Sequence, residues 1–158
     1  MNTFRPTVAY GENYTLRAEL VNGVPIRFVV ERTNNYKEEN ADIINFRDVT
    51  SFHIDVQESD RERMRINSKG EEVGYDLPHY EYSYDFYGEI HINHPYFDEI
   101  TFQINSDAVN LEMVERNSGF GGMRNGFDPM MHREYRQYRS MCDELEELFR
   151  FVPQRRRR

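Results

Sequence analysis

The chain has 158 residues and a net charge of −8, and 14% of its residues are aromatic. This length is typical of one domain, and the aromatic content is too high for a disordered chain. No segment approaches the roughly 20 apolar residues that span a bilayer, and the N-terminus lacks the apolar core of a signal peptide. The only cysteine, Cys142, excludes an internal disulfide framework. We therefore expect a soluble cytoplasmic protein, or a virion protein if its origin is viral.

The charges are unevenly distributed along the chain. Residues 1–115 hold 22 acidic and 10 basic side chains, whereas residues 116–158 hold 6 and 10. No Lys or Arg lies between Lys69 and Arg116, a segment with eleven acidic residues. Such a division bears on binding partners and solubility rather than on fold.

The clearest local signal is a β-hairpin. Residues 14–21 alternate between apolar and polar, and Asn22-Gly23 supplies the two positive-φ positions of a type I′ turn. Residues 25–31 form the returning strand, in which Ile26, Phe28 and Val30 are expected to share one face.

The rest of the first two thirds also has the period of β-strands. Residues 80–86 alternate strictly, and the segment 108–115 fits a strand better than a short helix. We interpret residues 33–40 as a polar loop and residues 58–63 as a charged connection. The remaining predicted strands are residues 43–46, 51–56, 64–66, 90–92 and 100–104. Many short strands separated by turns predict a mainly β fold, an antiparallel β-sandwich or barrel-like domain.

A C-terminal amphipathic helix follows this β domain. Four glycines within residues 117–127 indicate a linker, and Asp128-Pro129 resembles a helix N-cap followed by the first helical residue. The predicted organisation is therefore a β domain (1–116), a Gly-rich linker (117–127), a helix (128–153) and an arginine tail (154–158). Along the helix, one apolar stripe repeats at spacings of three and four residues, and it consists of Met131, Tyr135, Tyr138, Cys142, Leu145, Phe149 and Val152.

This stripe is the candidate partner interface. A flexible linker is a poor means of holding a helix on its own domain, and the spacing is the one by which helices pair. Arginines near the helix start and acids near its end oppose the helix dipole, and would complement an antiparallel copy. We predict that the stripe packs on another chain, and packing on its own domain is the alternative.

Two charged segments are secondary candidates. The tail residues Arg155, Arg156, Arg157 and Arg158 could contact the phosphates of nucleic acid or an acidic partner. The acidic, tyrosine-rich strands could present a surface to a basic protein, in the manner of a nucleic-acid mimic. The residues of that surface would be Glu81, Asp85, Glu89, Asp98 and Glu99.

Catalytic and metal-binding signals are weak. His91 and His94 precede Asp98 and Glu99, but positions i and i+3 of a strand point to opposite faces, so the histidines converge only if the chain turns at Pro95. Cys142 lies within the apolar stripe, where a thiol acts as a small apolar side chain. Since no phosphate loop or nucleophile motif is present, we expect no cofactor, no metal, no catalytic residue and no small-molecule substrate.

The expected function is therefore non-enzymatic. We expect a structural, assembly or protein-interaction module, such as an accessory subunit of a larger assembly, viral assemblies included, that docks through its C-terminal helix on itself or another subunit. The alternatives are an acidic inhibitor or adaptor that binds a basic protein, and a nucleic-acid contact through the arginine tail. Membrane binding is not expected.

Overall fold

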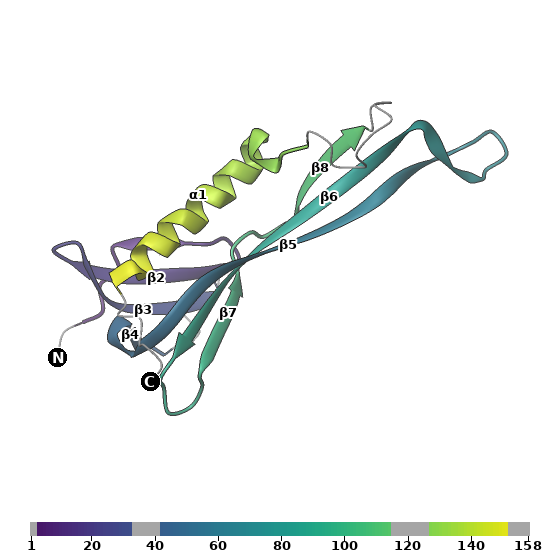
Figure 1. The fold of residues 1–158 in the computed structure, drawn as a ribbon. Helices are drawn as coiled ribbons and strands as arrows, with labels where there is room; N and C mark the ends of the chain where they lie inside the picture. The colour runs from purple at the N-terminus through teal and green to yellow at the C-terminus, as the bar shows by residue number, and fades with distance from the viewer. Residues whose placement is uncertain (1–2, 33–41, 115–126, 152–158) are drawn as a thin grey trace, which may run out of the picture. The chain divides into compact units, whose positions relative to one another are not determined.

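The computed structural model describes residues 3–32, 42–114 and 127–151, whose helices and strands are labelled in Figure 1. They belong to two compact units: unit 1 comprises the described residues of Met1–Val56, Phe86–Ser106 and Tyr138–Arg158, and unit 2 those of Gln57–Asp85 and Asp107–Gln137. The elements are β1 (Val8–Tyr10), β2 (Tyr14–Val21), β3 (Val24–Arg32), β4 (Ile44–Asn45), η1 (Phe46–Asp48), β5 (Val49–Ile66), β6 (Glu72–Ile92), β7 (Glu99–Gln103), β8 (Val109–Val114), η2 (Pro129–Met131), α1 (Arg133–Leu148) and η3 (Phe149–Phe151).

The first sheet, in unit 1, has the strand order β1-β2-β3-β4 and is antiparallel. Its central hairpin is the predicted one, with Val21 opposite Val24 and positive φ angles of 53° at Asn22 and 78° at Gly23. Positive φ at both central residues defines a type I′ turn, so this prediction is confirmed.

The predicted facing of β3 is wrong at its first residues. The register shifts between Glu19 and Leu20, so that Glu19 pairs with Arg27 while Leu20 pairs with Pro25. Ile26 is the extra residue of this irregularity, and its side chain is 40% exposed, whereas Phe28 is fully buried. A bulge redirects the side chains on one side of it, which strict alternation does not anticipate.

The second sheet contains β5, β6 and β7 in that order, and β8 also pairs with β6. In unit 1, β6 pairs with β7 from Tyr87 to His91, and in unit 2 it pairs with β8 from His79 to Tyr84. β5 has 18 residues and β6 has 21, so residues 58–63 are strand rather than the predicted connection. They are exposed on both faces and therefore lack the apolar alternation that identifies a half-buried strand. The strand predicted over residues 108–115 is confirmed as β8, which covers Val109–Val114.

The core of unit 1 is aromatic. Phe149 lies 5.7 Å from Phe28 of the first sheet, 5.1 Å from Phe46 of η1 and 4.2 Å from Phe52 of the second sheet, as measured between ring centroids. The segment at the C-terminal end of α1 therefore packs against residues of both sheets. The architecture is mainly β, with two antiparallel sheets and a C-terminal helix, as the sequence predicts.

The start of the helical region also follows the sequence signal. The Asp128 side chain accepts a hydrogen bond from the Met130 backbone N–H at 2.9 Å, and Pro129 is the first residue of η2. The α-helix itself begins at Arg133, one turn later than predicted. Most of the predicted linker (117–127) and all of the predicted polar loop (33–40) lie outside the described residues.

Candidate interaction surface

The C-terminal half of the helical stripe is buried within unit 1. Cys142 and Leu145 are fully buried, and Phe149 is 5% exposed. Phe149 stacks on Phe52 with an interplanar angle of 7°. The prediction that these three side chains pack on another chain is therefore wrong, and the alternative, packing on the protein's own sheets, is correct for them. Sequence periodicity identifies a buried face but not the surface that buries it.

Tyr138, in the middle of the stripe, is hydrogen-bonded to a carboxylate. The Tyr138 hydroxyl donates to Glu12, at 2.8 Å from Oε1 and 2.9 Å from Oε2, and its ring stacks on Phe86 at 5.6 Å. Glu12 Oε1 also accepts from the Ser106 backbone N–H at 2.6 Å and from its hydroxyl at 2.9 Å. Partial burial alone would raise the pKa of Glu12, but these hydrogen bonds outweigh it and hold the pKa below its ordinary value of 4.5.

We predict that Glu12→Gln lowers the free energy of unfolding by about 2 kcal/mol, the scale of hydrogen bonds to a charged group. The pKa of Glu12 is lower in the folded protein than its ordinary value of 4.5. The stabilisation that its carboxylate contributes is therefore complete above pH 4.5, and it is lost as the pH falls through the pKa of the folded state. The variant should therefore lose less stability than the parent on acidification, as followed by denaturant unfolding at several pH values. Tyr138→Phe should destabilise less, and equal acid sensitivity of Glu12→Gln and the parent would contradict this account.

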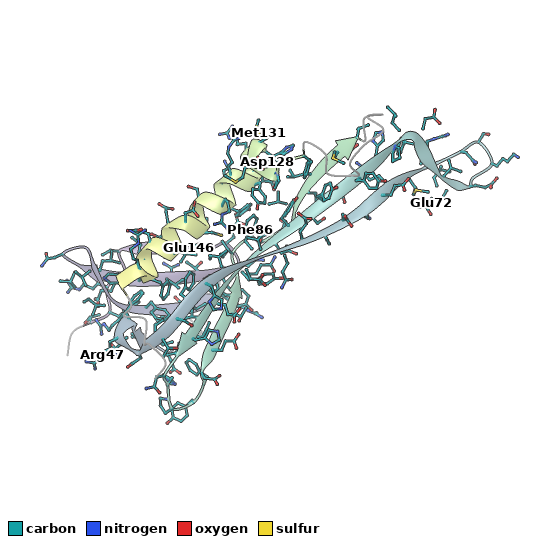
Figure 2. The ribbon with its side chains drawn as sticks, in the orientation of Figure 1. Arg47, Glu72, Phe86, Asp128, Met131 and Glu146 are labelled. Atoms are coloured by element: carbon teal, nitrogen blue, oxygen red, sulfur yellow. The ribbon has the colours of Figure 1, made fainter. Side chains whose placement is uncertain are left out.

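The first part of the stripe belongs to unit 2. The Tyr135 ring meets Tyr84 edge-on at 4.9 Å and 78°, and Tyr84 is 2% exposed. Met131 is 75% exposed (Figure 2), so of the described stripe residues it presents the most open apolar surface. Val152, the last predicted stripe residue, lies outside the described part of the chain.

Charged side chains of α1 form ion pairs within the helical segment. The Arg139 guanidinium lies 3.1 Å from Asp143 and 3.5 Å from Glu146, and Arg150 lies 2.9 Å from Glu147. Pairs at i,i+4 and i,i+3 stabilise a helix on its own. The charge pattern therefore does not require an antiparallel helical partner.

Cys142 is not a reactive thiol. Burial raises its pKa to about 11, and Asp143 and Glu146 add to this while Arg139 opposes it. A thiol at this pKa holds almost no thiolate at neutral pH, as expected of an apolar core residue.

The predicted acidic surface is partly neutralised in unit 2. Glu81 Oε1 lies 2.9 Å from an Arg61 guanidinium nitrogen, and Glu112 Oε2 lies 2.7 Å from that of Arg63. Both arginines belong to the charged segment that we interpreted as a connection, and pairing it as part of β5 brings them beside the acids. Asp85 is half-buried on the same strand, while Asp98 and Glu99 are exposed in unit 1.

Glu89 lies between two histidines of unit 1. Its Oε1 atom is 3.0 Å from His91 Nε2 and 3.5 Å from His53 Nε2. The hydrogen bond with His91 lowers the pKa of Glu89 below 4.5, with a further contribution from His53. The sequence pattern paired His91 with His94 instead, but His94 stacks on Phe97 at 4.1 Å. His53 and His91 are 38 residues apart, so only the pairing of β5 with β6 reveals the group.

Two surface depressions of unit 1 have room for small molecules. Neither lining contains a histidine, and the acidic residues in both come from the exposed side of α1. The larger, of about 510 Å³, is lined by Ser51, Phe52, Asp143, Glu146, Glu147, Phe149 and Arg150, and the smaller, of about 260 Å³, by Tyr10, Leu20, Gly23, Pro25, Glu144, Glu147 and Leu148.

Several exposed apolar strand residues of unit 2 lie beyond the end of β8. We call residues 61–66 of β5, residues 72–78 of β6 and their connecting turn the ribbon, since β8 pairs with β6 only from His79 onward. Figure 1 shows β5 and β6 continuing past β8, and Figure 2 shows Glu72 near the turn. The ribbon exposes Met64 (41%), Ile66 (67%), Tyr75 (36%) and Leu77 (48%). Sequence reasoning recognised only residues 64–66 as a strand and attached no function to it.

The helices of the described segments are all too short or too polar to traverse a lipid bilayer. The tail residues Arg155–Arg158 lie outside these segments, so the predicted phosphate contact stays a prediction. No protein-family model, curated protein or solved structure matches this chain.

Proposed function

We propose that this chain is a non-enzymatic assembly module that associates with further copies of itself through the ribbon of unit 2. The observation that carries the proposal is the exposure of Met64, Ile66, Tyr75 and Leu77 on two strands that no third strand accompanies within the described residues 42–114 and 127–151. A two-stranded ribbon is at best marginally stable alone, and clustered exposed apolar side chains are typical of interaction sites.

The two faces of the ribbon are chemically complementary. Strand alternation places Glu62, Met64 and Ile66 of β5 on one face, and the approach of Glu62 Oε2 to within 3.0 Å of a Cβ at Gly74 assigns the even-numbered residues of β6 to that face. This first face thus joins apolar side chains on β5 to the acids Glu72 and Asp76 on β6.

The second face has the opposite arrangement. Arg63 contacts Glu112, which also contacts His79, and the His79 ring stacks on Tyr75 at 4.0 Å. The odd-numbered residues therefore share this face, with Arg61, Arg63 and Arg65 on β5 and Tyr75 and Leu77 on β6.

When the first face of one copy packs on the second face of another, apolar side chains meet apolar side chains and acids meet arginines. With β5 of one copy over β6 of the other, Met64 and Ile66 meet Tyr75 and Leu77, and the acids of β6 meet the arginines of β5. Such a contact joins different surfaces of the two copies, and it builds rings or open chains rather than a closed dimer.

The expected association is weak. Burying four apolar side chains contributes roughly 6–12 kcal/mol, which the cost of association, about 4–15 kcal/mol, largely offsets. We therefore expect Kd values of roughly 1 μM to 1 mM. The weight-average mass of the full chain, measured by sedimentation or light scattering, should rise with concentration and fall with added salt.

Two substitutions test the contact, one on each face. Ile66→Asp and Leu77→Asp should each reduce the mass to that of a monomer at concentrations where the parent associates. Val24→Asp is the matched control, because Val24 lies on a strand of unit 1 with the same exposed fraction as Leu77, 48%. It should leave association unchanged.

A charge exchange tests the orientation. Arg65 and Asp76 lie on opposite faces of one ribbon, so they can meet only between copies. Arg65→Asp and Asp76→Arg should each weaken association, and the double variant should restore it. A parent chain that is monomeric throughout the concentration range, or an Ile66→Asp variant that associates like the parent, would refute the proposal.

A further inference from the structure

His53, Glu89 and His91 form a compact group on the polar side of the second sheet in unit 1. One potential ligand atom from each lies within 4.8 Å of the other two. His53 comes from β5, and Glu89 and His91 come from the neighbouring strand β6, two residues apart and therefore on the same face. The intervening Ile90 is fully buried on the opposite face, which fixes the direction of its two neighbours.

The distances within this group suit a tetrahedral metal ion. Zinc bonds of about 2.0–2.1 Å to nitrogen and oxygen place neighbouring ligand atoms about 3.3 Å apart in a tetrahedron. The His91 Nε2–Glu89 Oε1 and His53 Nε2–Glu89 Oε1 distances are 3.0 and 3.5 Å. Small side-chain rotations would open these contacts for an ion, and the side chains of His53 and His91 are 55% and 36% exposed.

The electrostatic surroundings favour a cation. Glu89 supplies the negative charge, and the sequence holds no Lys or Arg between Lys69 and Arg116, which covers all of β6 and β7. The register places Thr101 opposite Glu89 and Glu99 opposite His91 on β7. Glu99 therefore adds a second carboxylate beside the group, and its Oε1 atom accepts a hydrogen bond from the Thr101 hydroxyl at 2.9 Å.

A second histidine–glutamate pair in the protein lies in surroundings that do not favour a cation. In unit 2, His79 Nδ1 lies 2.8 Å from Glu112 Oε1, but the other Glu112 oxygen is 2.7 Å from the Arg63 guanidinium. There an arginine, and not a second imidazole, is the other partner of the carboxylate. This pair offers only two ligands and lies beside a positive charge, so His79 serves as the control in the binding test.

We propose that His53, Glu89 and His91 bind a divalent transition-metal ion of the zinc class, with water completing its coordination. Two imidazoles and one carboxylate suit Zn²⁺ and its neighbours, whereas Mg²⁺ and Ca²⁺ require oxygen ligands. The bound ion would join β5 to β6 in unit 1. This site does not involve the ribbon in unit 2, so the outcome of its test is independent of the proposed self-association.

Titration of the untagged full chain with Zn²⁺ at neutral pH tests the proposal. Calorimetry should give one site per chain, and His53→Ala, His91→Ala and Glu89→Gln should each weaken binding by at least about tenfold, since even loss of an outer partner of a metal ligand costs that much. His79→Ala should bind like the parent. Circular dichroism of each variant establishes that it is folded, as expected for side chains on an exposed face.

Two further measurements distinguish a specific metal site from the general affinity of surface histidines for metal ions. Co²⁺ should give the visible absorption of a four- or five-coordinate ion in the parent and in His79→Ala but not in His53→Ala. Mg²⁺ should not compete. Equal Zn²⁺ binding by His53→Ala and His79→Ala, or no binding by the parent, would mean that Glu89 only links two imidazoles by hydrogen bonds, and would overturn the proposal.

Discussion

Replacement of Leu145 by Asp is expected to unfold unit 1. Leu145 is fully buried, and it lies on α1 between Cys142 and Phe149, which are buried with it. Truncating such a leucine costs about 2–5 kcal/mol, and burying a carboxylate without a partner costs several more. The sum, at least about 5 kcal/mol, is comparable with the whole stability of a typical domain.

The matched control places the same charge on the exposed side of the same helix. Ser140 is exposed, so Ser140→Asp should change the free energy of unfolding by less than about 0.5 kcal/mol. Thermal unfolding followed by circular dichroism, with the solution mass measured in parallel, separates the two accounts of the stripe. If Leu145→Asp kept the melting temperature of the parent and only lowered the mass, the buried half of the stripe would serve another chain after all.

Replacement of Gly88 by Val is expected to destabilise unit 1 by about 3 kcal/mol. A Cβ at Gly88 would lie 2.7 Å from Phe102 Cε1 and 2.9 Å from Phe102 Cζ, closer than packed carbon atoms approach. Phe102 is directly opposite Gly88 on β7 and is only 3% exposed, so its ring has little room to move. Adding atoms to a filled core typically costs 1–3 kcal/mol, and valine adds three carbons.

A second glycine of the same strand provides the control. A Cβ at Gly74 meets only Glu62 Oε2, at 3.0 Å, which is the end of a flexible and exposed side chain. Gly74→Val should therefore be tolerated, and should gain slightly from the strand preference of valine. Denaturant unfolding of both variants tests the comparison. Equal stability of the two would show that the Phe102 ring repacks freely, contrary to this account.

Several local features could be predicted from the residues alone. Asn22-Gly23 requires only the conformational freedom of two adjacent residues, and it forms the predicted turn. The alternation of residues 80–86 buries Tyr82, Tyr84 and Phe86, because a strand directs every second side chain to the same face. Asp128 caps the helical region through an atom two residues away. Each of these depends on contacts within a few residues, which the sequence order specifies directly.

The tertiary structure decided which surfaces meet. The bulge at Glu19/Leu20 exposes Ile26, and the pairing of the charged segment of β5 with β6 sets Arg61 beside Glu81. The C-terminal half of the stripe packs on the phenylalanines of the protein's own sheets, and strand pairing brings His53 to Glu89. Apart from the bulge, which lies within one hairpin, these contacts join residues far apart in the chain. Their partners are selected by register and packing, whose free energies depend on the whole fold rather than on any local pattern.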